Sequence, residues 1–241
     1  MFLSGRIFKL SKLLKYRLWR KGLFKGIAAT IELENLVKDI NPETIIDVGS
    51  NKGQFIMLIE QLFPDKIIYS FEPLQEVLEI QKRFFNYKKN IYYYNFALGS
   101  SSSVKEFYLT KRMDSSSFFK INPIANKNEN FQIKEKRDIT IKTLDEVMFN
   151  KKLIKPLLLK IDVQGYELEV LKGSEKLLKK VDYLLLEVSK NEMYINQSKE
   201  DEIVEYLKHQ NFYILIKNNW TQIKKTNFVQ RDILFRKQEN Q

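Results

Sequence analysis

The stretch that decides the fold spans residues 44–53 and reads Thr44-Ile45-Ile46-Asp47-Val48-Gly49-Ser50-Asn51-Lys52-Gly53. A short β-branched run ends in an acidic residue and then breaks into a turn of small residues. A helical pattern of apolar residues follows over residues 55–62. Strand, glycine turn and helix in this order open an α/β nucleotide-binding sheet, whose ligands bind beyond the carboxyl ends of the strands. Glycine suits such a turn because the backbone must approach a ligand closely or adopt a positive φ.

The turn lacks the spacing of two common phosphate-binding loops. A dinucleotide fingerprint would have glycines in place of Asn51 and Gln54. A phosphate-gripping loop would have Ser or Thr after Gly-Lys, whereas Lys52 here precedes Gly53. Asp47 would repel a pyrophosphate, and its charge suits a cationic ligand.

The next two predicted strands supply further cofactor-binding candidates. The second strand, residues 67–71, ends at Glu72, whose carboxylate is placed to accept hydrogen bonds from both hydroxyls of a ribose. A ribose without a phosphate, beside a cation, describes S-adenosylmethionine. The third strand, residues 91–95, would bring Asn95 and the backbone near Ala97 beside an adenine ring. Each of these signals has an alternative explanation when it is taken alone. The glycine motif or the Glu72 motif would fit an ordinary strand-to-helix turn, and Asn95 would fit a polar turn.

Two later buried strands also end near acidic residues. Asp162 closes the strand over residues 156–162, and Glu187 lies near the carboxyl end of the strand over residues 183–188. About 60 residues separate the third strand from residue 157, more than a helical crossover needs. We expect an inserted antiparallel hairpin there, over the ligand-binding face.

The length and composition indicate one large α/β domain, residues 41–241, preceded by an arm, residues 1–40. The chain has no cysteine and a single histidine, His209, which argue against thiolate metal sites, cysteine nucleophiles and a Ser-His-Asp triad. We expect His209 to lie at the surface near a helix end. No apolar run is long enough to span a bilayer, and we expect a cytoplasmic protein.

The N-terminal arm is basic and amphipathic. Residues 1–26 contain eight basic residues and no acidic residue. This segment therefore contributes +8 to the net charge of +11 of the whole chain. Between these basic residues, apolar residues recur at helical spacing and form a stripe: Leu3, Ile7, Leu10, Leu14 and Leu18. Two interpretations stay open: a helix packed on the body, or peripheral contact with an anionic membrane. Nucleic acid is the weaker candidate, because the aromatic residues follow the apolar stripe instead of forming a stacking platform.

The sequence resembles the FkbM-type family of class I S-adenosylmethionine-dependent methyltransferases from about residue 41 to 236. The matching stretches are IIDVGSNKG (45–53), FEP (71–73), NFALG (95–99) and LLLKIDVQGYELEVLKG (157–173), supported by TLDEV (143–147) and LLLEVS (184–189). One departure is Gln164, where family members frequently carry Glu; glutamine keeps the hydrogen-bonding shape without the charge.

The resemblance implies a Rossmann-like, seven-stranded, mostly parallel sheet with an antiparallel last strand. It also implies methyl transfer, usually to a hydroxyl oxygen. By motif match, Asp47, Gly49, Asn51 and Gly53 would surround the methionine part of the cofactor, and Glu72 would bind its ribose.

An alcohol acceptor must lose its proton, and a carboxylate or a metal site can assist. Asp162 is the first candidate for that role, followed by Glu167 and Glu187. Stabilisation of the helix N-terminus is an equal alternative for Glu167, and contact with a substrate hydroxyl is the alternative for Glu187. The carboxylates would suit Mg²⁺, although no ligand spacing demands it.

The leading function is O-methylation of a small molecule or glycan with a free hydroxyl. A cofactor-binding or membrane-associated protein without turnover is the alternative. A nucleic-acid methyltransferase is a weaker third candidate, because outside the arm the chain has little basic excess.

Overall fold

The first strand lies in the middle of the main sheet. The computed structural model describes residues 2–126, 128–223 and 226–238. All five residues of β1 (Thr44–Val48) are buried. Both of its neighbours pair with it in parallel, β2 (Ile67–Phe71) on one side and β7 (Leu157–Ile161) on the other. The strand is therefore covered on both faces, as parallel sheets generally are.

The main sheet confirms the expected topology. Its long strands run in the order β3 (Ile91–Tyr94), β2, β1, β7, β8 (Tyr183–Ser189), β11 (Val229–Lys237) and β9 (Phe212–Lys217). The last strand, β11, is antiparallel to both β8 and β9, as predicted. A two-residue strand, β10 (Thr221–Gln222), extends the sheet beyond the seven expected strands by pairing with β11.

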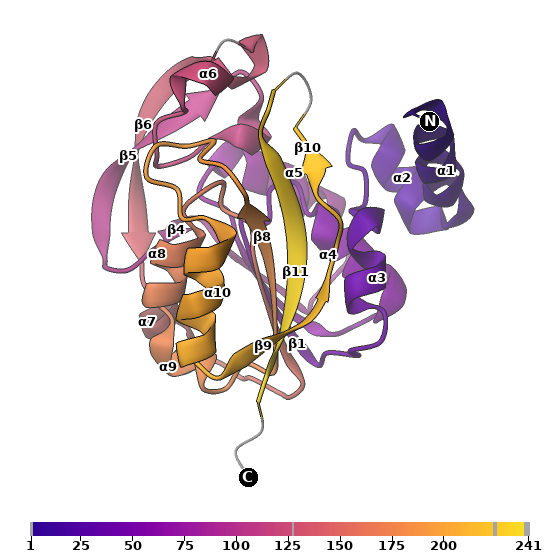
Figure 1. The fold of residues 1–241 in the computed structure, drawn as a ribbon. Coiled ribbons are helices and arrows are strands. Elements are labelled where there is room, and N and C mark those ends of the chain that lie inside the picture. Colours follow the sequence, from indigo (N-terminus) through magenta and orange to yellow (C-terminus); the bar gives the residue numbers. More distant parts are fainter. Residues whose placement is uncertain (1, 127, 224–225, 239–241) are drawn as a thin grey trace.

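The predicted hairpin insertion forms a second sheet (Figure 1). Strands β5 (Ser103–Thr110) and β6 (Ile133–Lys142) pair antiparallel. The short strand β4 (Ala97–Leu98) pairs in parallel with β6, so the segment after β3 belongs to this sheet. Between β5 and β6 the chain forms helix α6 (Pro123–Asn126) and two 3₁₀ turns, Met113–Ser115 and Glu129–Phe131.

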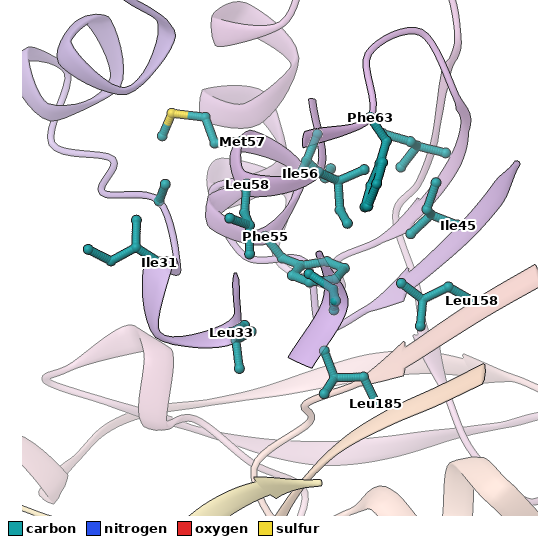
Figure 2. Packing of buried hydrophobic residues seen from close by; sticks show 14 of the residues in the cluster. Ile31, Leu33, Ile45, Phe55, Ile56, Met57, Leu58, Phe63, Leu158 and Leu185 are labelled. Atoms are coloured by element: carbon teal, nitrogen blue, oxygen red, sulfur yellow. The ribbon is translucent and has the colours of Figure 1, made fainter. Parts of the chain in front are cut away.

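Helices cover both faces of the main sheet, because successive strand residues point to opposite sides. Ile45 and Leu158, which are register partners, pack against one helical layer, whereas Ile46 and Leu159 pack against the other. Figure 2 shows the first of these clusters. Helices α3 (Glu34–Val37), α4 (Gln54–Leu62) and α5 (Gln75–Phe84) contribute to it, together with Leu13 and Trp19 of the N-terminal arm. The opposite face carries α7 (Leu144–Met148), α8 (Glu167–Lys172), α9 (Glu175–Leu178) and α10 (Glu200–His209).

The N-terminal arm differs from the single helix expected. It forms α1 (Phe2–Lys15) and α2 (Arg17–Phe24), which are separated by the extended backbone of Tyr16. Leu13 and Trp19 are buried, whereas Leu10 and Leu14 of the predicted stripe are exposed. Of the two interpretations left open, packing on the body therefore holds for the side of Leu13 and Trp19 and does not hold for Leu10 and Leu14. Further along the chain, a 3₁₀ turn (Ile31–Leu33) leads directly into α3.

Trp19 anchors the arm. Its side chain is fully buried, and its indole Nε1 donates a hydrogen bond to the Met57 carbonyl at 3.0 Å. Gly22 on α2 lies so close to Met57 that a Cβ there would overlap the Met57 side chain. Among the described helices, none combines the length and apolarity needed to cross a bilayer.

We predict that Trp19→Ala lowers the free energy of unfolding by about 3–5 kcal/mol, because it removes a large buried ring and leaves a cavity against α4. Urea unfolding followed by circular dichroism measures the change. Leu14→Ala, at an exposed position of the same arm, is the control and should cost within about 0.5 kcal/mol. Equal losses in the two variants would contradict the packing of α2 on α4.

Candidate active site

The turn after β1 is shaped by a close approach between two strand ends. Gly49 has a φ of +77°, and a Cβ on it would overlap the carbonyl oxygen of Asp162. The amides of Gly49 and Ser50 both donate to the Phe71 carbonyl at 3.0 Å. The ends of β1, β2 and β7 are thereby drawn together, which only glycine permits at position 49.

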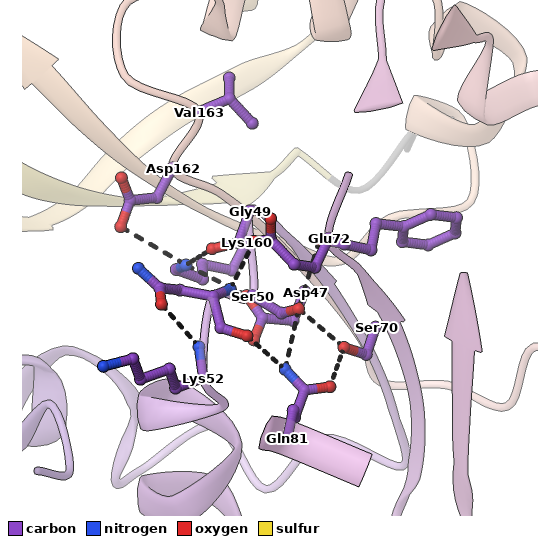
Figure 3. Close-up of polar contacts among 12 residues, drawn as sticks. Asp47, Gly49, Ser50, Lys52, Ser70, Glu72, Gln81, Lys160, Asp162 and Val163 are labelled. Atoms are coloured by element: carbon purple, nitrogen blue, oxygen red, sulfur yellow. Dashed lines mark hydrogen bonds and ion pairs between the residues drawn. The ribbon is translucent and has the colours of Figure 1, made fainter. Parts of the chain in front are cut away.

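A buried glutamine that the sequence analysis missed supports the same turn (Figure 3). The Gln81 side-chain amide donates to the Asn51 carbonyl at 2.9 Å and to Ser50 Oγ at 3.0 Å. Its oxygen accepts from Ser70 Oγ at 2.6 Å. A polar residue within the buried stripe of α5 was the sequence signal, because Gln81 follows Val77 and Leu78 at helical spacing.

Glu72 lies at the end of β2 and lines a cavity, as predicted. Its carboxylate accepts from the Asn51 amide at 3.0 Å and from the Leu74 amide at 2.9 Å. Burial raises the pKa of Glu72 to about 7, although these two amides act to lower it. Each carboxylate oxygen has a further lone pair, so Glu72 can also accept hydrogen bonds from a ligand.

The other cofactor-binding candidates divide into two groups. Gly49, Asn51 and Ala97 line the cavity. Asp47, Gly53 and Asn95 are not among the described residues that line the cavity. The exposed Asn95 side chain donates to the carbonyls of Glu72 and Pro73, both at 3.0 Å, and thus holds the segment that carries Glu72.

Asp47 lies beneath the turn, paired with a lysine. Lys160 Nζ lies 3.1 Å from Asp47 Oδ1 and 3.5 Å from Asp162 Oδ2 (Figure 3). Burial acts to lower the pKa of Lys160, but the charges of Asp47 and Asp162 overcome it and raise the pKa. Burial raises the pKa of Asp47, and Lys160 opposes that rise. Lys160 also lines the cavity, and its ammonium group links Asp47, beneath the turn, to Asp162.

Asp162 and Glu187 both face the cavity and are joined by one amide. Gln164 Nε2 donates to Asp162 Oδ1 at 2.9 Å and lies 3.3 Å from Glu187 Oε2. Gln230 Nε2 contacts the other Glu187 oxygen at 2.5 Å. Burial, together with the charges of Asp162 and Asp232, raises the pKa of Glu187 well above its ordinary value. Glu187 is therefore suited to hold a hydroxyl, and Asp162 is the better candidate to accept a proton.

Gln164 is itself held in an unusual backbone conformation. Its φ is +59°, a region that L-residues other than Asn and Asp rarely adopt. Ser117 Oγ donates to its carbonyl at 2.6 Å, and the Tyr194 hydroxyl lies 3.1 Å from its Oε1. Such strain persists only where the surroundings determine it, and it concentrates at functional sites.

Glu167, a predicted catalytic residue, is turned away from the cavity. Its Oε1 accepts from the amides of Val163 and Gly165 at 3.1 and 3.0 Å. Burial raises its pKa to about 7. The side chain is 3% exposed and is not among the described residues that line the cavity. Glu167 therefore holds the loop after β7, and we withdraw it as a catalytic candidate.

The cavity has a volume of about 470 Å³, which is in the range of small-molecule sites. Its lining combines the strand ends with Ser115 and Ser116 of the insertion and with Phe96, Phe118 and Met193. The glycine turn, the buried carboxylate of Glu72 and the flanking aromatic residues fit S-adenosylmethionine.

The expectation of Mg²⁺ finds no support in this arrangement. Across the described residues, no group of three or more His, Cys, Asp or Glu side chains is placed to hold a metal ion. The Lys160 ammonium lies between Asp47 and Asp162, where it offsets part of their charge. His209 is exposed and pairs with Glu205 on α10, as expected for a surface residue.

Comparison with solved structures shows the same fold in S-adenosylmethionine-dependent enzymes. Magnesium protoporphyrin IX methyltransferase from Synechocystis PCC 6803, with bound S-adenosylmethionine, superposes with a TM-score of 0.50 at 11% identity and covers 98% of this chain and 92% of its own. TrmK of M. capricolum, in complex with S-adenosylhomocysteine, gives a TM-score of 0.51 at 14% identity, covering 86% and 68%.

Sequence comparison gives a more specific relationship. The hexuronic acid methyltransferase AglP of Haloferax volcanii is 27% identical over 175 residues, which are 71% of this chain. The matched region spans 66% of the length of that relative. Residues 47–214 match the model of the methyltransferase FkbM domain, which is more than half of the chain. The chain therefore belongs to the FkbM methyltransferase family.

Proposed function

We infer that this protein transfers the methyl group of S-adenosylmethionine to an oxygen of a sugar-containing acceptor. One observation carries the inference: Asp162 and Glu187 face the same cavity as the Gly49 turn and Glu72. A cofactor site and a pair of carboxylates thus open on a single space. The similarity to a hexuronic acid methyltransferase supports a sugar as the acceptor.

The protein has two tasks in such a reaction. When bound, S-adenosylmethionine supplies a methyl group already activated by its sulfonium, so alignment is the larger part of catalysis. The Gly49 turn and Glu72 would hold the cofactor at the ends of β1 and β2. Asp162 would accept the proton of the acceptor hydroxyl, and Glu187 would orient the acceptor through a hydrogen bond.

The test is transfer of an isotopically labelled methyl group from S-adenosylmethionine to oligosaccharides, some containing hexuronic acid and others neutral. Mass spectrometry identifies the methylated product, and NMR locates the methyl group on a hydroxyl or a carboxyl oxygen. Cofactor binding without transfer to any member of the panel would favour the alternative of a binding protein without turnover.

We predict that Glu72→Gln weakens S-adenosylmethionine binding about a hundredfold, because charge-assisted hydrogen bonds to the ribose are lost. Isothermal titration calorimetry measures the dissociation constant. Glu167→Gln is the matched control, since it removes a buried carboxylate that lies outside the cavity lining. Wild-type affinity in Glu72→Gln would disprove the ribose-binding role.

We also predict that cofactor binding releases about half a proton per molecule at pH 7. The pKa of Glu72 is about 7, so the free protein holds it partly protonated at that pH. Ribose hydroxyls donate to the ionised carboxylate, which lowers its pKa and expels the proton. Affinity should therefore fall as the pH drops below 7. Calorimetry in phosphate and in Tris, which differ in ionisation enthalpy, counts the protons; undiminished release in Glu72→Gln would contradict this assignment.

Asp162→Asn should lower turnover by a factor of about 10²–10⁴ while cofactor affinity stays within about threefold of wild type, because the base is lost and the cofactor site is kept. Glu187→Gln should act mainly on the KM of the acceptor. Steady-state kinetics on an acceptor identified by the panel separates the two effects. A larger loss of kcat in Glu187→Gln than in Asp162→Asn would reverse the assigned roles.

A further inference from the structure

The N-terminal helices hold most of the net charge of the chain. Residues 1–26 carry eight basic residues and no acidic residue, which leaves 33 basic and 30 acidic residues over 27–241. The positive charge is thus concentrated on α1 and α2, and the rest of the molecule is nearly balanced. A localised charge of this kind attracts an anionic partner.

Only one side of this arm is held by the body. Leu13 and Trp19 are buried in the core beside α4. Lys9 pairs with Glu32 at 2.7 Å, and Lys12 pairs with Glu34 at 2.5 Å. These contacts fix the two helices, and they use the Leu13 side of α1.

A second apolar side of the arm faces outward. Leu10 and Leu14 are 48% and 42% exposed, and their spacing of four residues places them on the same side of α1. Phe24, at the end of α2, is 85% exposed. In Figure 1, α1 lies at the outer edge of the molecule, beyond α2 and α3. The sequence pattern was therefore right that these leucines share a side, although that side does not pack on the body.

Basic residues accompany the outward leucines. Lys15, Arg17 and Lys25 are exposed, and among the described side chains of the arm only Lys9 and Lys12 form ion pairs with carboxylates. An outward surface that combines Leu and Phe with unneutralised Lys and Arg has the composition of helices that lie in the interface of an anionic bilayer. Each exposed lysine or arginine of this kind adds to the binding free energy near anionic lipid.

We propose that α1 and α2 dock this protein on an anionic lipid surface through Leu10, Leu14 and Phe24, with Lys15, Arg17 and Lys25 contacting lipid phosphates. Nucleic acid would satisfy the charges but would leave the leucines exposed. It would also lack a stacking platform in the arm's tryptophan, because Trp19 is buried. The bilayer is the partner that accounts for both features.

Docking has a consequence for the active site. Lys9, Thr30 and Glu32, at the junction of the arm and the body, line the cavity. An arm lying on a bilayer would bring this side of the cavity toward the lipid surface, where a sugar attached to a lipid would meet it. This consequence rests on the proposed function, whereas the docking itself does not.

The experiment is co-sedimentation of the full chain with vesicles, without cofactor or acceptor. The chain should pellet with vesicles of equal parts phosphatidylcholine and phosphatidylglycerol and remain in the supernatant with phosphatidylcholine alone. Raising the salt concentration should weaken the binding. Failure to pellet with the anionic vesicles at low salt would overturn the proposal.

Two variants separate the charge from the apolar contact. Lys15→Gln/Arg17→Gln/Lys25→Gln should weaken vesicle binding about a hundredfold, because the variant lacks three positive charges that would contact lipid phosphates. Leu10→Ser/Leu14→Ser should weaken it about tenfold without a change of charge. Lys134→Gln/Lys176→Gln/Lys208→Gln, at exposed positions on the body, is the matched control and should bind like wild type.

Three results would contradict the proposal: an equal loss in the control variant, unchanged binding in the leucine variant, or tighter binding to a single-stranded RNA than to the vesicles. Calorimetry with S-adenosylmethionine on the same preparations distinguishes the causes of failure. Wild-type cofactor affinity in the arm variants shows that they are folded, and loss of vesicle binding then belongs to the arm alone.

Discussion

A single buried ammonium group links the fold to the site. Lys160 lies on β7 directly across from Asp47 on β1, and both side chains are almost entirely buried. Removing two charges from water is costly, so such a pair is maintained only by close contact, and removing one partner typically costs 3–5 kcal/mol. Because Lys160 also reaches Asp162, it ties the centre of the sheet to the residue that we assign as base. The contact between β1 and β7 and the charge environment of Asp162 at the cavity therefore both depend on Lys160.

The pairing also changes how the site attracts a cationic cofactor. Asp47 alone would present a full negative charge to the cofactor, but the positive charge of Lys160 offsets it. Asp47, Asp162 and Lys160 together carry one net negative charge. Burial raises the pKa of Glu187 well above its ordinary value, so it adds little charge at neutral pH, and it raises the pKa of Asp232 to about 7, so Asp232 adds about half a charge. The site is therefore weakly anionic overall, which suits a sulfonium without the cost of several unpaired buried carboxylates.

The sequence was most informative about which residues meet at one edge of the sheet. Glu72 and Asp162 follow parallel strands, and Glu187 lies near the end of another, so pairing and direction alone bring them together. The hairpin insertion followed from a connection length, and the antiparallel last strand from the family resemblance. Side-chain direction could not be predicted in this way. Glu167 and Asn95 turn toward nearby backbone groups, a choice that depends on loop geometry.

The arm shows a different limit of sequence patterns. Its leucines follow a helical period, but the period identifies a shared side without saying what that side contacts. Leu13 and Trp19 fall off the predicted stripe and yet form the packed side, because Trp19 packs into the core beside α4 and donates a hydrogen bond to the Met57 carbonyl there. Gln81 was missed, and Gln164 was noted only as a departure from the family pattern, for a related reason. A buried amide acts through partners from several strands and loops, and these come together only in the folded chain.

Gln164 shows why a departure from the family pattern can be consistent with function. A carboxylate at this position would place a third acid beside Asp162 and Glu187, with the Tyr194 hydroxyl as its only donor among the hydrogen bonds described for the side chain. The amide instead provides N–H groups to both neighbouring acids and an oxygen that accepts from Tyr194. It therefore removes a like-charge repulsion and adds a bridge between the two acids. That bridge holds Asp162 and Glu187 next to one another, as the proposed roles of a base and an acceptor-holding carboxylate require.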